Sequence, residues 1–260
     1  NEPNLASFNL NKDGGAVYAA LLRASAEEIK AVDPTAKVGG PAVTGINGYW
    51  GRDYFTDAMD AGMGDYADAV TLHAYADDAA EKSDMPQSIE WFRNKFREYT
   101  GKTAEVWSSE SGYSSADEGI DERAKGAFNS RATVYYKAAG LCDKVIFYNF
   151  EKKGVVKTDK EHQFGHVSPA SAYGDKSGKS FVPEISYAMI TGMNYVMART
   201  AGGEIIDSDD KNVRICSFDS DKFGKKVLAL YTLGDAKCVT LNLGAEKVTY
   251  YDSLGNAEEI

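Results

Sequence analysis

The chain has 260 residues, of which 43% are hydrophobic and 26% are charged, a balance that is typical of globular proteins and excludes a disordered or fibrous one. A formal net charge of -10 would repel nucleic acid over most of the surface, so a neutral or cationic ligand is expected. The three widely spaced cysteines argue against a zinc cage or a disulfide scaffold, and no apolar run reaches the roughly 18 residues that a membrane span needs.

Helical and strand-like patterns alternate along the first 200 residues. Apolar residues at helical spacing predict a helix from Val17 to Val32, and the short apolar run that follows predicts a strand at 36–43. Further helices are predicted at 49–63, 89–99, 121–139 and 183–199, and further strands at 68–75, 103–110 and 143–150. Strands that alternate with long helices are typical of βαβ units, so we expect an α/β fold with a parallel sheet.

The pattern changes after Arg199. Short apolar runs separated by glycine, aspartate and asparagine predict antiparallel strands at 204–207, 213–218, 226–233, 237–243 and 247–251. We therefore expect one domain over residues 1–200 and a small antiparallel β domain, or part of one, over residues 201–260.

Two carboxylates stand where the predicted strands end. In parallel α/β proteins the functional side chains come from loops at the carboxyl ends of strands, and Glu2 and Glu110 occupy such segments. A carboxylate pair that faces one cleft is the usual equipment of glycoside hydrolysis, one group acting as acid and the other as nucleophile or base. His73 and Tyr75 are candidate hydrogen-bond donors that would keep one of them ionised. The alternative to a catalytic role is that such a glutamate is solvated and that the histidine is hydrogen-bonded within the core.

Four segments resemble a known family. Asn1-Glu2-Pro3-Asn4-Leu5 resembles the Asn-Glu-Pro signature after the fourth strand of clan A glycoside hydrolases, which are retaining enzymes on a (β/α)8 barrel. The segment Trp-Ser-Ser-Glu-Ser-Gly at 107–112 resembles their seventh strand, and two predicted strands lie between these segments, as in the clan. The strands with Val-Gly-Gly-Pro-Ala and His-Ala-Tyr are most similar to family 39, the β-xylosidase and α-L-iduronidase group, which has a β-sandwich beside its barrel.

The resemblance implies a role for each matching residue. Glu2 would be the acid/base, Glu110 the nucleophile and Asn1 a donor to the sugar 2-hydroxyl, while His73 and Tyr75 would line the cleft. The substrate would be a β-linked oligo- or polysaccharide, with no metal or other cofactor.

The resemblance is incomplete at two places. The eighth strand of the clan usually offers a tryptophan as the sugar platform, whereas this chain has Tyr148 and Phe150 there, and Tyr148 is the predicted substrate residue. Strands one to three of such a barrel have no counterpart, so the chain is expected to be the C-terminal half of a larger enzyme and inactive alone. Secretion is expected for that parent enzyme.

Three alternatives remain open. The chain could be a non-catalytic carbohydrate-binding or scaffolding protein on a half-barrel, or it could belong to an endo-acting glucanase, mannanase or xylanase of a sister family. His162 and His166, beside Glu161, could hold a metal, but the absence of the helical H-E-x-x-H context favours a long loop over 152–180 that shapes substrate access.

Overall fold

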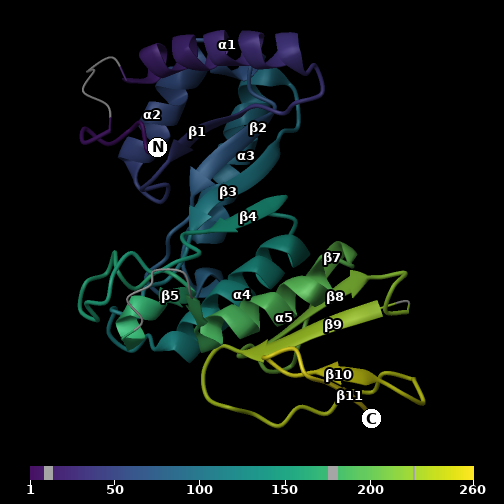
Figure 1. The fold of residues 1–260 in the computed structure, drawn as a ribbon. Helices are drawn as coiled ribbons and strands as arrows, with labels where there is room; N and C mark the ends of the chain where they lie inside the picture. Colours follow the sequence, from purple (N-terminus) through teal and green to yellow (C-terminus); the bar gives the residue numbers. More distant parts are fainter. Residues whose placement is uncertain (9–13, 175–180, 225) are drawn as a thin grey trace. The chain divides into compact units, whose positions relative to one another are not determined.

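The computed structural model describes residues 1–8, 14–174, 181–224 and 226–260 (Figure 1). These residues form two compact units. The first comprises Asn1–Ser111 and Leu141–Phe147, and the second comprises Gly112–Gly140 and Tyr148–Ile260. None of the helices in the described residues combines the length and the apolar character that crossing a membrane requires.

The first unit is built on a four-stranded parallel sheet. Its strands lie side by side in chain order: β1 (Gly39–Val43), β2 (Ala69–His73), β3 (Glu105–Ser111) and β4 (Lys144–Phe147). Helix α2 (Tyr49–Asp60) connects β1 to β2, and α3 (Met85–Thr100) connects β2 to β3, while α1 (Gly14–Val32) precedes β1. Short 3-10 turns lie at Met63–Asp65 and Ala80–Lys82. The expected βαβ order is confirmed.

Burial explains why these segments take these forms. All five residues of β2 are buried, as expected for a central strand of a parallel sheet. Helix α1 buries a single stripe of small and apolar residues, namely Gly15, Ala19, Leu22 and Ala26. It packs on α2 so closely that a Cβ on Gly15 would lie 2.6 Å from the backbone nitrogen of Ala58. Helix α3 ends at Gly101, whose positive φ of 68° suits glycine.

The second unit combines two helices with antiparallel strands. Helices α4 (Glu122–Ala138) and α5 (Ile185–Met197) pack against each other, and β7 (Ala201–Ile206), β8 (Val213–Asp219) and β9 (Lys226–Thr232) form an antiparallel sheet. Two strand pairs complete it, β5 (Val167–Pro169) with β6 (Phe181–Pro183) and β10 (Thr249–Tyr251) with β11 (Ala257–Glu259), together with a 3-10 turn at Ala170–Tyr173. A core of Val134, Ala138, Met197, Cys216 and Phe218 joins α4 and α5 to β8.

The α/β class followed by antiparallel strands is confirmed, with one wrong element. Residues 237–243 form no strand, and the apolar side chains that suggested one, Val239, Leu241 and Leu243, are exposed. Alternating apolar residues do not by themselves form a strand, because a strand also needs a neighbouring strand with which to form hydrogen bonds. The prediction also missed β11, whose Ala-Glu-Glu sequence has no apolar pattern. The proposed boundary after residue 200 coincides with the start of β7 and stays a prediction.

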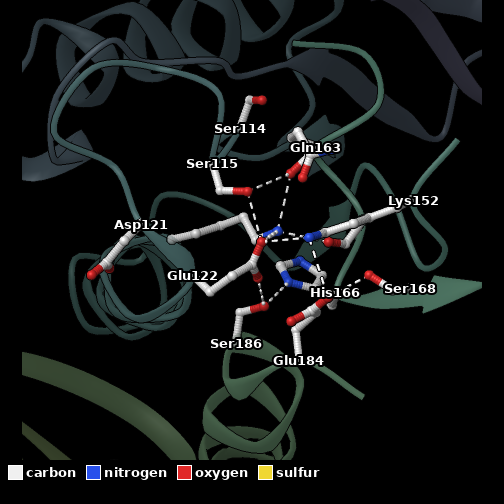
Figure 2. Close-up of polar contacts among 12 residues, drawn as sticks. Ser114, Ser115, Asp121, Glu122, Lys152, Gln163, His166, Ser168, Glu184 and Ser186 are labelled. Atoms are coloured by element: carbon white, nitrogen blue, oxygen red, sulfur yellow. Dashed lines mark hydrogen bonds and ion pairs between the residues drawn. The ribbon is translucent and has the colours of Figure 1, made fainter. Parts of the chain in front are cut away.

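A cluster of polar contacts around Glu122 ties α4 to the long segment that follows β4 (Figure 2). A buried lysine of α4 is part of this cluster. The side chain of Lys125 has no solvent exposure, and its ammonium group donates to the Glu122 carboxylate at 2.9 Å. It also donates to the backbone carbonyls of Gln163 at 3.0 Å and Gly165 at 2.6 Å. Burial lowers the pKa of Lys125 to about 8. Because a buried charge is costly unless it is paired, these bonds fix the position of residues 163–165.

A second lysine extends this cluster to the N-terminus of α5. The Lys152 ammonium group lies 2.8 Å from Glu122 and 3.3 Å from Glu184, the residue that precedes α5. Ser186 donates to the other Glu122 oxygen at 2.9 Å. Burial alone would raise the pKa of Glu122, but the charge of Lys125 and the hydrogen bond from Lys152 outweigh it and lower the pKa to about 2. The cluster therefore holds two carboxylates and two ammonium groups in balance.

Replacing the buried lysine should destabilise the protein strongly. In Lys125→Met the Glu122 carboxylate and two backbone carbonyls lose a donor, and removing one partner of a buried ion pair typically costs about 3–5 kcal/mol. Lys247→Met is the matched control, because Lys247 pairs with Glu259 at an exposed site and exposed pairs contribute about 0–1 kcal/mol. Urea unfolding measures both variants, and equal losses would contradict this role for Lys125.

The same cluster predicts that the protein loses stability as the pH falls into the acid range. Since the folded-state pKa of Glu122 is about 2 and its ordinary value is 4.5, its stabilising contribution is complete above pH 4.5 and is lost as the pH falls toward 2. The free energy of unfolding of Glu122→Gln should fall less steeply with pH over this window than that of the parent. The exposed Glu118→Gln variant should follow the parent, and superimposable profiles of parent and Glu122→Gln would refute the assignment.

Candidate functional site

Two carboxylates and a histidine converge at the carboxyl ends of β2 and β3. His73 Nδ1 lies 3.1 Å from Oε1 of Glu2 and 3.4 Å from Oε2 of Glu110. One atom from each of the three side chains lies within 4.8 Å of the others, so the two carboxylates are close neighbours. The sequence placed these residues at strand ends, and the structure brings them together within the first unit.

An irregularity in β3 sets Glu110 opposite His73. The register pairs Leu72 with Ser108 and then His73 with Glu110, so Ser109 is an extra residue in β3. Such bulges are frequent next to active sites, where they re-aim a side chain. In a regular register Ser109 would pair with His73, and Glu110 would lie one position beyond His73. No feature of the sequence Trp-Ser-Ser-Glu-Ser indicates the bulge.

The N-terminal segment is held against β1 by an asparagine. Asn4 Nδ2 donates to the carbonyl of Thr44 at 2.9 Å, and the Thr44 amide donates back to Asn4 Oδ1 at 3.2 Å. A turn closed by the Leu5 amide on the Glu2 carbonyl at 2.9 Å orients the segment further. Glu2 itself has a positive φ of 37°, which costs a non-glycine residue about 1–3 kcal/mol and is typical of functional sites. Asn4 belongs to the Asn-Glu-Pro-Asn-Leu motif, but nothing in the sequence indicates its bonds to Thr44.

Tyr75 completes the surroundings of Glu110. Its hydroxyl donates to Glu110 Oε2 at 3.0 Å, and its ring meets that of His73 edge-on. The backbone amide of Ala74 also donates to the Glu110 carbonyl at 2.9 Å. The His73 side chain is only 3% exposed, whereas those of Glu2 and Glu110 are 15% and 26% exposed. A substrate can therefore reach the carboxylates while the imidazole behind them stays buried.

Asn1 and Tyr148 are the other two predicted site residues. Asn1 is exposed beside Glu2 in the chain. Tyr148 belongs to the second unit, where its hydroxyl donates to Glu161 at 2.8 Å and its ring packs on Phe164. The roles predicted for Asn1 and Tyr148 stay predictions.

The alternative metal pair does not assemble. Within the part of the chain that the structure describes, the residues that could hold a metal ion together are Glu2, His73 and Glu110, and His162 and His166 are not among them. His166 Nδ1 lies 3.1 Å from the Ser186 hydroxyl instead, and burial lowers the pKa of His166 to about 4, so it is neutral near pH 7.

Comparison with known proteins places the chain by its fold. No protein-family model matches it, and no curated protein sequence does. Among solved structures, a family 39 glycoside hydrolase from the gut symbiont Bacteroides cellulosilyticus matches with a TM-score of 0.61 and 18% identity, over 90% of this chain and 46% of that one. A family 51 α-L-arabinofuranosidase from Bifidobacterium longum matches with a TM-score of 0.57 and 10% identity, over 84% and 50%.

A glucosidase from Croceicoccus marinus also matches, with a TM-score of 0.54 and 16% identity, over 77% of this chain and 43% of that one. The chain therefore shares its fold with clan A glycoside hydrolases, as the sequence resemblance implied, and spans about half their length or less. The parallel sheet with its following β strands corresponds to part of a TIM barrel and a β domain.

The two hydrogen bonds between Asn4 and Thr44, here called the tether of Asn4, can be tested directly. In Asn4→Ala the Thr44 amide loses its acceptor and the N-terminal segment loses both side-chain bonds to β1, so amide hydrogen exchange should accelerate in peptides that cover residues 1–8 and 44. Asn256→Ala, which removes an exposed bond to Asp252 in the second unit, is the control. Unchanged exchange in Asn4→Ala would show that the tether does not hold the segment.

Proposed function

We propose that the chain carries the catalytic carboxylates of a glycoside hydrolase that cleaves a β-linked glycan with retention of configuration. Glu110 is the nucleophile and Glu2 is the acid/base. The observation that supports this most strongly is the proximity of the two carboxylates, with His73 between them, at the carboxyl edge of a parallel sheet. The shared fold with glycoside hydrolases adds to it.

The spacing favours retention over inversion. Retaining enzymes hold their carboxyl groups about 5–5.5 Å apart, whereas inverting enzymes separate them by about 6.5–9.5 Å to admit a water molecule. One oxygen of Glu2 and one of Glu110 lie within 4.8 Å of each other, which is closer to the retaining arrangement than to the inverting one. We therefore propose that one carboxylate attacks the sugar itself.

The reaction then proceeds by two displacements. Glu110 attacks the anomeric carbon while Glu2 gives its proton to the leaving glycosidic oxygen, which forms a glycosyl-enzyme ester. Glu2, now a carboxylate, takes a proton from water, and the resulting nucleophile releases the sugar and restores Glu110. Two carboxylates suffice for this route.

The neighbouring side chains fit these roles. The Tyr75 hydroxyl donates to one oxygen of Glu110, which orients the carboxylate and leaves the other oxygen for attack. His73 contacts both carboxylates from its buried position and restricts their rotamers. Asn1 would donate to the sugar 2-hydroxyl, and Tyr148 would offer a stacking surface.

The same comparison supports a proposal for the substrate and for the extent of the active enzyme. The structural neighbours are about twice as long as this chain. We expect catalysis to need the further strands that close a barrel, and the chain alone to be inactive. The likeness to family 39 favours a short β-linked substrate such as a xyloside, and an enzyme of this kind is expected to act outside the cell.

Covalent trapping tests the proposal. The longest product of the reading frame that encodes this chain is incubated with 2-deoxy-2-fluoro-β-glycosides that carry an activated leaving group, and labelled peptides are identified by mass spectrometry. The fluorine slows hydrolysis of the ester, so the label should accumulate on Glu110.

Substitutions supply the control. Glu110→Gln should abolish labelling and lower turnover by about 10⁴-fold or more. Glu105→Gln is the matched control. Glu105 lies at the other end of the same strand and accepts a hydrogen bond from Trp107, so this variant should keep both labelling and turnover. A label on another residue, or an active Glu110→Gln variant, would refute the nucleophile assignment.

A further inference from the structure

We propose that Glu2, His73 and Glu110 also form a binding site for one divalent transition-metal cation such as Zn²⁺. The three side chains offer one imidazole nitrogen and two carboxylate oxygens that already point toward one another. Binding itself does not depend on the proposed hydrolase activity. Only its consequence, inhibition of hydrolysis, rests on the proposed function.

The distances suit a small cation. Zinc binds nitrogen and oxygen ligands at about 2.0–2.2 Å in tetrahedral geometry, which places two ligand atoms about 3.4 Å apart. The separations of His73 Nδ1 from the Glu2 and Glu110 oxygens, 3.1 Å and 3.4 Å, are close to this value. The oxygens of the two carboxylates lie within 4.8 Å of each other and would have to approach by up to about 1.4 Å to reach this separation.

The donor set selects the class of metal. Calcium and magnesium prefer sites made of oxygen alone, whereas an imidazole with carboxylates suits zinc and related ions. Three protein ligands with partly exposed carboxylates leave a fourth position for water, as in zinc sites with an open coordination position. The Tyr75 hydroxyl fixes the orientation of Glu110, as outer hydrogen bonds commonly do for metal ligands.

Occupation of this site would block the proposed reaction. A bound cation draws electron density from the Glu110 carboxylate and makes it a weaker nucleophile, and it occupies Glu2, which then cannot carry the proton for the leaving group. The ion would therefore act as an inhibitor that competes with substrate.

Other zinc ligands in the chain must be separated from this site. Cys238 is an exposed free thiol, and His162 Nε2 lies 3.8 Å from an oxygen of Asp159. The experiment is therefore performed on the chain with Cys238→Ser, and His162→Gln in that background is the matched control.

Isothermal titration with ZnCl₂ gives the decisive result. The Cys238→Ser chain should bind one ion, His73→Gln should weaken binding at least about tenfold, and His162→Gln should leave it unchanged. Circular dichroism checks the fold of each variant. Should His73→Gln not fold, Glu110→Gln replaces it, because the partly exposed Glu110 contributes less to packing than the buried His73.

The metal proposal and the proposed function fail in different ways. No saturable binding up to about 1 mM Zn²⁺ would overturn the metal site, as would unchanged affinity in both His73→Gln and Glu110→Gln. Either result leaves covalent trapping on Glu110 untouched. Conversely, one-site zinc binding that depends on His73 supports the metal site even where no fluoroglycoside label appears.

Discussion

The candidate site depends on one constraint, the position of a buried histidine between two carboxylates. His73 sits at the end of a fully buried strand, where packing leaves its ring little freedom. Two local devices bring the carboxylates to it: the extra residue Ser109 in β3, and the bonds of Asn4 to Thr44. Moving either carboxylate by one residue would separate the pair. The chemistry therefore rests on backbone register more than on the identity of the side chains alone.

The sequence predicted the sheet and singled out three residues that the structure brings together, but it did not predict the backbone geometry that does so. Helical periodicity and buried apolar runs such as Ala-Val-Thr-Leu-His located the elements to within a few residues, because burial leaves a direct mark on composition. Glu110 was singled out because it stands at the end of a predicted strand, and Glu2 because its Asn-Glu-Pro segment matches a family motif. The bulge at Ser109 and the tether of Asn4 leave no periodic signal, since each depends on a partner elsewhere in the chain. The same reason explains the false strand at 237–243.

The carboxylates of the two units differ in the groups with which they are paired. In the second unit, Lys125 and Lys152 neutralise Glu122 and Glu184. These buried ion pairs hold the backbone around them in one position. In the first unit, Glu2 and Glu110 have no ammonium partner among their described contacts and share one imidazole while remaining partly exposed. Two neighbouring carboxylates without a cation destabilise the folded protein, because like charges repel each other. They are suited to proton transfer, to nucleophilic attack and to the capture of a divalent cation.

The stereochemistry of the first product tests the central claim most directly. Proton NMR on the longest product of the reading frame, recorded immediately after a β-glycoside substrate is added, distinguishes the two anomers before they equilibrate. Carboxylates as close as Glu2 and Glu110 predict that the β-anomer appears first. An initial α-anomer would mean inversion by an activated water, and it would contradict the assignment of these two residues as acid/base and nucleophile.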